Sequence, residues 1–216
     1  MVNKILKDVK SLQNSEINKI VLNRVREFSS FKNKSSEAWF SELCYCILTA
    51  NSKAKTALAV QKELGSEGFL VYSHEKLAEI IKKNKHRFHN NKAKYIVEAR
   101  KFENIKNRIQ GLAQPGDYKS HSNAREFIVK NIKGLNYKEA SHFLRNVGYF
   151  NLAILDRHIF DIMVNYGLLK EKPKSLTKKG YLAIEEKFNS LAHKAGIAPG
   201  VFDLYVWYLK TGEILK

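Results

Sequence analysis

The sequence predicts an all-α protein. Apolar residues recur at helical spacing, for example in Phe40, Leu43, Cys44 and Ile47, and start or stop signals flank these runs. The chain has three prolines, no clear hairpin signal and no internal repeat of fixed period. We therefore expect helices packed on helices, without a sheet.

The helices expected in chain order follow from these signals. The ranges are Glu16–Phe28, Ser35 or Ser36 to Leu48, Lys55–Leu64 closed by Gly65, Glu75–Lys83, Lys92–Phe102, Ala124–Ile132, Tyr137–Val147, Arg157–Tyr166, Lys178–Ala195 and Gly200–Lys210. The last range is rich in β-formers, but Phe202, Tyr205, Val206 and Leu209 keep a helical pattern, so we expect a helix there.

Length and composition indicate an ordinary globular chain. The 216 residues can build a substantial core, and 44% hydrophobic with 27% charged residues exclude a disordered or fibrous protein. The chain has only two cysteines, Cys44 and Cys46, which excludes a four-cysteine metal or iron–sulfur site within it. Because they point to different sides of a helix, we expect neither a chelate nor a disulfide framework. With no long apolar run and no signal peptide, we expect a soluble, intracellular protein.

The charge points to a polyanionic partner. The net charge is +17, and residues 51–150 carry +11 of it. Nucleic acid is the first candidate partner and an anionic membrane surface the second. The tract Lys82–Lys94 has six cations and no acid, and it includes Phe88 among them. Such a tract is typical of a solvated face, but the aromatic residue also suits a loop that touches a duplex.

A tight turn joins two of the expected helices. One helix begins at Asn123, with Glu126 forming a capping box, and the next begins at Asn136 with Glu139 in the same relation. Gly134 supplies the positive φ that so short a turn needs. The turn leaves helix N–H groups facing outward, where they can bind a phosphate. It is the shape of a helix–hairpin–helix DNA-binding element, although a purely structural αα-hairpin has the same pattern.

Lys138 breaks a local rule at this turn. It lies at the second position of its helix, where the helix dipole disfavours a cation. A rule broken at a tight turn suggests function, because the same field favours the neutral, nucleophilic amine. Lys138, Ser141, His142 and Arg145 share one face of the helix, and the opposite face packs inward. The alternative is an ordinary solvated lysine.

Asp156 follows the apolar run Ala153-Ile154-Leu155 and precedes the helix from Arg157. It is a natural N-cap, and it can be that alone. A carboxylate that accepts backbone N–H bonds stays ionised, so it can also stabilise a cationic sugar or an iminium in a nearby cleft.

Four stretches of the chain resemble one family. They are Asn131–Gly148 followed by Ala153–His158, Trp39–Asn51, His86-Arg87-Phe88, and Asp203–Gly212. Together they resemble the archaeal-type (type 2) 8-oxoguanine DNA glycosylase/AP lyases of the helix–hairpin–helix glycosylase superfamily, over nearly the whole chain. Asn136 departs from the family, whose hairpin usually carries a second glycine there. Asn tolerates left-handed φ and can also cap, so we expect no loss of function.

The resemblance implies a mechanism and a fold. Lys138 is implied as the nucleophile that attacks C1′ of a flipped nucleotide, and Asp156 as the carboxylate that stabilises the charge; a Schiff base and β-elimination follow. No metal or organic cofactor is required. The implied fold has two all-α lobes with the active-site cleft between them. We expect one lobe from 36–150, with the hairpin at 124–147, and the other from 1–35 plus 151–216.

The expected partner is double-stranded DNA that contains 8-oxoguanine or abasic sites, bound by a monomer in the cytoplasm of an archaeon or bacterium, at the nucleoid. Two alternatives remain open. One is a related glycosylase for another damaged base; the other is a non-catalytic helix–hairpin–helix DNA-binding module, in which Lys138 merely contacts phosphate.

Further residues are expected to bind DNA or the lesion. Phe88 is the candidate wedge, with Arg87 beside it and Asn51 as a weaker candidate for filling the gap. An ordinary core position is the alternative for Phe88. The resemblance implies lesion recognition by the terminal Lys216, with Trp207 or Tyr208 stacking on the base. The other residues expected at the DNA are Gly134, Asn136, His142 and Arg145.

Overall fold

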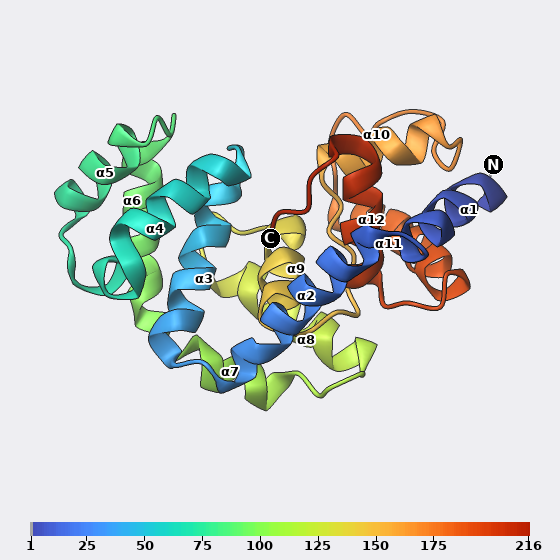
Figure 1. The fold of residues 1–216 in the computed structure, drawn as a ribbon. Helices are drawn as coiled ribbons and strands as arrows, with labels where there is room; N and C mark the ends of the chain where they lie inside the picture. The colour runs from blue at the N-terminus through green and yellow to red at the C-terminus, as the bar shows by residue number, and fades with distance from the viewer. Residues whose placement is uncertain (1) are drawn as a thin grey trace.

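The computed structural model describes residues 2–216, which contain α-helices and two short 3-10 helices and no β-strand. The all-α prediction is confirmed. The α-helices are α1 (Val2–Gln13), α2 (Glu16–Ser30), α3 (Ser36–Thr49), α4 (Ala54–Val71), α5 (His74–Lys83), α6 (His89–Ala99), α7 (Ile105–Leu112), α8 (Tyr118–Asn131), α9 (Tyr137–Asn146), α10 (Arg157–Asn165), α11 (Lys178–Lys194) and α12 (Pro199–Thr211) (Figure 1). The 3-10 helices are Phe31–Asn33 and Arg100–Phe102.

Several predicted boundaries are wrong, and each error has a local cause. Helix α8 begins at Tyr118 because Asp117 caps it, accepting hydrogen bonds from the backbone N–H groups of Lys119 and Ser120 at 3.0 Å each. The predicted capping box of Asn123 and Glu126 therefore lies inside the helix. Helix α6 begins at His89, before the predicted Lys92, and α4 continues past Gly65, whose φ of 62° kinks it.

Two helices were not predicted, α1 and α7. In α1, apolar residues do recur at helical spacing, in Val2, Ile5, Leu6, Val9 and Leu12, so this helix could have been predicted. Helix α7 has eight residues and buries two, Ile105 and Ile109, so its periodic signal is weak and packing against other helices decides that it folds.

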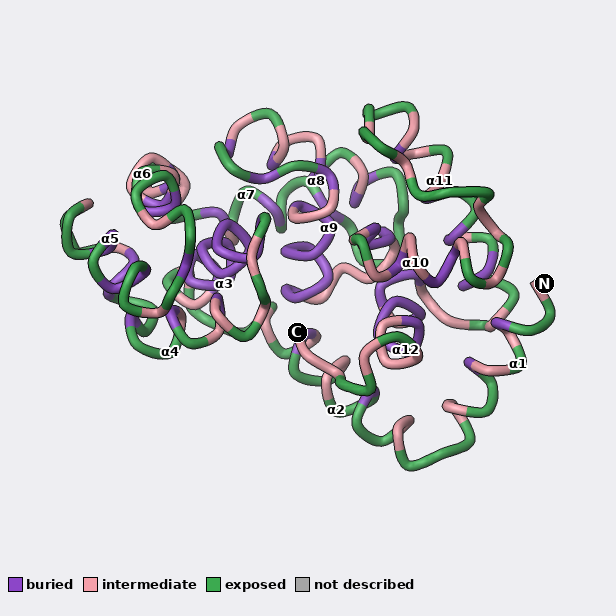
Figure 2. Tube along the Cα trace, turned by 90° about the horizontal axis from the view of Figure 1, so that it is seen from above, coloured by how far each residue is buried: buried purple, intermediate pink, exposed green. Residues whose placement is uncertain are grey.

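The buried side chains form two clusters. One surrounds α3, in which every residue from Trp39 to Thr49 is buried, and draws on residues 39–152 (Figure 2). The other gathers residues from α1, α2, α10, α11 and α12. These clusters fit the two predicted lobes, although Tyr137 belongs to the second cluster and Leu152 to the first. The lobe boundaries themselves stay a prediction.

A fully buried ion pair links the two clusters. Arg125 of α8 donates to both carboxylate oxygens of Glu185 of α11, at 2.5 and 2.8 Å. Glu185 also accepts the backbone N–H of Ala153 at 3.1 Å, and Arg125 donates to the Ser141 hydroxyl on α9 at 3.1 Å. This network ties α9 to the segment that leads into α10.

None of the helices within residues 2–216 is long and apolar enough to cross a membrane.

The last residues of the chain leave α12 and run to the middle of the molecule, beside α9 (Figure 1).

Candidate active site

A cavity of about 1200 Å³ lies where several parts of the chain meet. Its walls come from the start of α9, the N-terminus of α10, one side of α12 and the C-terminal residues, and also from the loop after α3 with the start of α4, the loop between α5 and α6, and residues in and before α11. Among the predicted site residues, it is lined by Lys138, Asp156, Trp207, His142, Arg145, Lys216, Asn51, Arg87 and Asn136. Tyr208 and Phe88 are not among the lining residues.

The turn before α9 is built as the hairpin motif requires. Gly134 has a φ of 83°, and a Cβ there would lie 2.6 Å from Cδ2 of Tyr95, so both conformation and space demand glycine. Asn136 is extended, with a φ of −117°, and caps α9 in a capping box with Glu139. The left-handed φ that a second glycine would supply is therefore not needed at Asn136.

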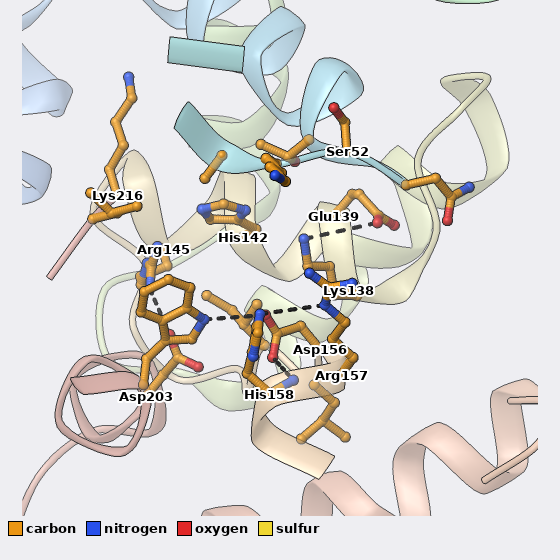
Figure 3. Close-up of a pocket in the computed structure, with 18 of the residues that line it drawn as sticks. Ser52, Lys138, Glu139, His142, Arg145, Asp156, Arg157, His158, Asp203 and Lys216 are labelled. Carbon is orange, nitrogen blue, oxygen red and sulfur yellow. Dashed lines mark hydrogen bonds and ion pairs between the residues drawn. The ribbon is translucent and has the colours of Figure 1, made fainter. Parts of the chain in front are cut away.

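Lys138 follows this cap in the first turn of α9. Its side chain is 23% exposed, and its Nζ lies 4.0 Å from Oε1 of Glu139. The short turn and the capping box fix the backbone that carries it. The amine is consequently reachable from the cavity while its position is set by the hairpin (Figure 3).

Asp156 is the N-cap of α10, as the sequence predicts. Its Oδ1 accepts the backbone N–H groups of His158 and Ile159 at 2.8 and 2.9 Å. Its Oδ2 accepts the indole N–H of Trp207 at 3.2 Å. Three donors therefore hold the carboxylate at the edge of the same cavity that Lys138 lines (Figure 3).

The segment before Asp156 is fixed by Tyr181 of α11. The Tyr181 hydroxyl donates to the carbonyl of Ala153 at 2.9 Å and accepts the N–H of Leu155 at 3.3 Å. The backbone N–H of Ala153 donates to Glu185. The N–H and carbonyl of Ala153 and the N–H of Leu155 are therefore all hydrogen-bonded to side chains of α11. The N-cap position of Asp156 is thus set by the second buried cluster.

Lys216 lies at the cavity, but the sequence did not predict how it is held. Its Nζ donates to Oε2 of Glu42 and to Oε1 of Gln61, each at 2.7 Å. The side chain extends away from Lys138 and Asp156 (Figure 3). The ammonium of Lys216 is therefore paired within the protein.

His142 and Arg145 are buried, which corrects the expectation that they reach DNA from an outward face. Arg145 is 4% exposed and donates to Oδ2 of Asp203 at 2.7 Å. His142 is 6% exposed, and neither ring nitrogen has a hydrogen-bond partner within the described residues. Burial lowers the pKa of His142 well below its ordinary range, and the nearby Arg145 lowers it further, so the ring is neutral.

The candidate wedge is on the surface. Phe88 is 41% exposed, so it is not a core aromatic, and the Arg87 guanidinium lies 5.1 Å from its ring centroid. Arg87 also donates to the carbonyl of Asn51 at 3.3 Å, and Asn51 has a φ of 59°. These three residues therefore form one exposed group, of which Arg87 and Asn51 line the cavity.

Part of the basic tract around Phe88 is structural. Lys92 is 4% exposed and donates to the carbonyl of Ile47 at 2.6 Å, and the His86 ring hydrogen-bonds to the carbonyl of Leu48 at 2.8 Å. These groups satisfy the last carbonyls of α3, which have no partner within the helix. Burial lowers the pKa of Lys92 to about 8.

Three residues of the site, Glu42, Gln61 and Tyr45, were not singled out from the sequence. Glu42 did leave a signal, because it is the single charged residue in the apolar run Trp39–Asn51. A carboxylate in such a run needs a buried partner. Only the fold identifies this partner as Lys216, which lies 174 positions away in the sequence.

Within residues 2–216, no three His, Cys, Asp or Glu side chains come together in a way that could hold an ion.

Comparison with known proteins adds to this geometry. The profile of a family described as 8-oxoguanine DNA glycosylase matches residues 21–197. The chain is 47% identical to the 8-oxoguanine DNA glycosylase/AP lyase of Methanocaldococcus jannaschii over 212 residues, which cover 98% of this chain and 99% of that protein.

Two solved structures are similar as well. The crystal structure of the Methanocaldococcus jannaschii enzyme in complex with a 15mer DNA containing 8-oxoguanine has a TM-score of 0.93 and 46% identity, covering 99% of this chain and 100% of that one. The 8-oxoguanine DNA glycosylase of Thermotoga maritima has a TM-score of 0.89 and 40% identity, covering all of both chains. Agreement of this extent in sequence and in fold shows that the chain belongs to the 8-oxoguanine DNA glycosylase family.

Proposed function

We propose that this protein excises 8-oxoguanine from double-stranded DNA and then cleaves the strand at the resulting abasic site, with Lys138 as nucleophile and Asp156 as its carboxylate partner. The observation that carries the proposal is that Lys138 and Asp156, from two different helix N-termini, line one cavity. The relatives' names support the same activities. The net charge of +17 suits a DNA substrate and association with the nucleoid.

The reaction begins with a nucleotide turned out of the duplex, because its C1′ cannot be reached inside the stack. The neutral amine of Lys138 attacks C1′, and the electron pair of the glycosidic bond leaves with the base. Positive charge develops on the sugar in this step. The fixed carboxylate of Asp156 lies where that charge can be stabilised, and its three donors prevent it from turning away.

Strand cleavage follows from the covalent product. Opening of the sugar ring converts the aminal into an iminium, which acidifies the protons on C2′. Loss of one C2′ proton to a base and departure of the phosphate on C3′ break the strand by β-elimination. Water then hydrolyses the iminium and restores the amine of Lys138.

Lesion recognition is assigned to the C-terminal residue and Trp207. 8-Oxoguanine carries an N7–H donor where guanine has an acceptor, so a hydrogen-bond acceptor at the cavity favours the damaged base. Lys216 lines the cavity, and its main-chain oxygen can supply such an acceptor. Trp207 lines the cavity as well, with its N–H directed to Asp156, which leaves the indole ring for contact with a base.

The first prediction concerns Lys138. Lys138→Gln should abolish excision and the covalent adduct that borohydride forms with 8-oxoguanine DNA, because an amide cannot form a Schiff base. Binding to damaged DNA should change little, since one cation of 38 is lost. Lys19→Gln, an exposed residue of α2, is the matched control and should trap normally. A covalent adduct formed by Lys138→Gln would show that another residue is the nucleophile.

The second prediction concerns Asp156. Asp156→Asn should keep the cap of α10 through its side-chain oxygen and lower the single-turnover excision rate by roughly 100-fold to 1000-fold, the usual effect of removing one electrostatic contact to a transition state. Thermal unfolding checks that the helix is intact. An unchanged excision rate would reduce Asp156 to a structural cap.

The third prediction concerns the wedge. Phe88→Ala should slow excision from duplex DNA more than from single strands, because only the duplex must be opened. Tyr72→Ala is the control, since Tyr72 is 39% exposed and Phe88 41%. Equal losses on duplex and single strands would argue against a wedge.

The fourth prediction concerns the terminus. Deleting Lys216, or extending the chain with a C-terminal tag, should lower 8-oxoguanine excision far more than cleavage at preformed abasic sites, which hold no base to recognise. Both rates are measured on one preparation. An equal fall in both rates would point to misfolding. If neither rate fell, Lys216 would have no role in the site.

A further inference from the structure

Two loops that border the cavity share an unusual backbone conformation. Within residues 2–216, the non-glycine residues with a left-handed φ are Asn51, at 59°, and Lys85, at 61°. Asn51 lies in the loop after α3 and Lys85 in the loop between α5 and α6, and both residues line the cavity. Lysine rarely adopts a left-handed φ, so the surrounding contacts must hold it there. Residues held in this way concentrate at functional sites.

The loop that contains Lys85 turns the chain sharply after α5. The backbone N–H of Lys85 donates to the carbonyl of Lys82 at 2.8 Å, and the N–H of His86 donates to the carbonyl of Ile81 at 3.2 Å. His86 is 3% exposed, whereas Phe88, two positions later, is 41% exposed. One short loop therefore presents a buried histidine to the core and an aromatic ring to the surface.

His86 uses both of its ring nitrogens. Its Nε2 hydrogen-bonds to the carbonyl of Leu48, near the end of α3, at 2.8 Å, and its Nδ1 accepts the backbone N–H of Phe88 at 3.2 Å. A carbonyl can only accept and a backbone N–H can only donate, so Nε2 carries the proton and Nδ1 carries none. The neutral ring, in this one tautomer, links α3 to the backbone of Phe88.

The surroundings of His86 keep its ring neutral. Burial lowers the pKa of His86 below its ordinary value, the bond to the α3 carbonyl raises it, and the nearby Lys92, His89 and Arg87 lower it again. A protonated ring would lose its acceptor at Nδ1 and leave a backbone N–H facing a second N–H. The link therefore depends on the neutral form that these groups favour.

Helix α3 offers a fixed support for this loop. Its residues are buried along most of its length, and its last carbonyls are bonded by His86 and by Lys92, whose Nζ donates to Ile47 at 2.6 Å. The Arg87 guanidinium adds a bond to the carbonyl of Asn51 at 3.3 Å. The chain around Phe88 is thus attached to the end of α3 and to the loop that follows it at three points.

We propose that His86 is a positioning residue, which fixes the backbone of Phe88 on α3 so that the Phe88 side chain can open the duplex beside the cavity. The inference rests on the proposed function and adds one residue to its duplex-opening step. Unstacking bases costs free energy, so a wedge on a loosely held loop would move aside instead of separating them. The two bonds of the His86 ring connect the wedge to the buried core and oppose that movement.

The test is His86→Phe, which keeps a ring in the buried position and removes both hydrogen bonds. Single-turnover excision of 8-oxoguanine is measured on duplex and on single-stranded DNA, and the ratio of the two rates is compared with that of the unaltered protein. The ratio should fall about five- to tenfold, the effect of losing one hydrogen bond at the opening step. Excision from single strands should fall less, because no duplex has to be opened.

His121→Phe is the matched control. His121 is 2% exposed, and its ring hydrogen-bonds to the carbonyl of Gln114 at 2.9 Å. It belongs to α8 and is not among the residues that line the cavity. The substitution removes a buried ring hydrogen bond of the same kind without touching the loop before α6, so the ratio of duplex to single-strand excision should stay unchanged.

A double variant tests whether His86 acts through Phe88. Phe88→Ala removes the side chain that opens the duplex, so the exact position of its backbone no longer matters. If His86 only positions Phe88, adding His86→Phe to Phe88→Ala should cause no further fall of the ratio.

Four results would overturn the positioning role of His86. They are an unchanged ratio in His86→Phe, an unchanged ratio in Phe88→Ala, an equal fall of the ratio in the His121→Phe control, and a full additional fall in the double variant. Failure of the proposed function itself looks different, because the unaltered protein would then not excise 8-oxoguanine or form the borohydride adduct.

Discussion

The arrangement of the site depends on the buried ion pair of Arg125 and Glu185. Both side chains are fully buried, and the Arg125 guanidinium lies 5.1 and 5.6 Å from the ring centroids of Tyr137 and Tyr181. Through Ser141 the pair holds α9, which carries Lys138, and through Ala153 it holds the segment that ends at Asp156. Removing either partner would leave an uncompensated charge in the core, so the pair forms as one unit. Lys138 and Asp156, the proposed nucleophile and its carboxylate partner, are therefore placed by contacts that neither of them makes.

The two central residues occupy helix N-termini with opposite electrostatic consequences. The dipole of α10 favours the Asp156 carboxylate, and the backbone N–H groups of its first turn hold it in place. The dipole of α9 disfavours a cation at Lys138, which stands one residue after the capped Tyr137. One helix terminus thus stabilises an anion, while the other presents an amine. The cavity that both residues line combines a lysine amine with a fixed carboxylate.

Charged groups near the cavity divide into those that are paired internally and those that remain for a ligand. Arg145 is paired with Asp203, and Lys216 with Glu42 and Gln61. Lys92 is paired with a helix carbonyl, although it lies in the most basic tract of the chain. A count of lysines and arginines therefore overstates the cations available to DNA around this cavity. The exposed cations that line the cavity outside these pairs include Lys53, Lys85, Arg87 and Arg157.

The sequence by itself determined the helical class, the hairpin turn at Gly134, the cap at Asn136 and the cap at Asp156, because these follow from local rules of φ, spacing and capping. Resemblance to a family added the roles of Lys138, Asp156 and Lys216. The tertiary structure alone decided that α7 folds, that Arg145 and His142 are buried, and that the Lys216 ammonium meets Glu42. The physical reason is distance along the chain: Glu42 and Lys216 are 174 positions apart, and a buried charge shows that a partner is needed but not which residue provides it.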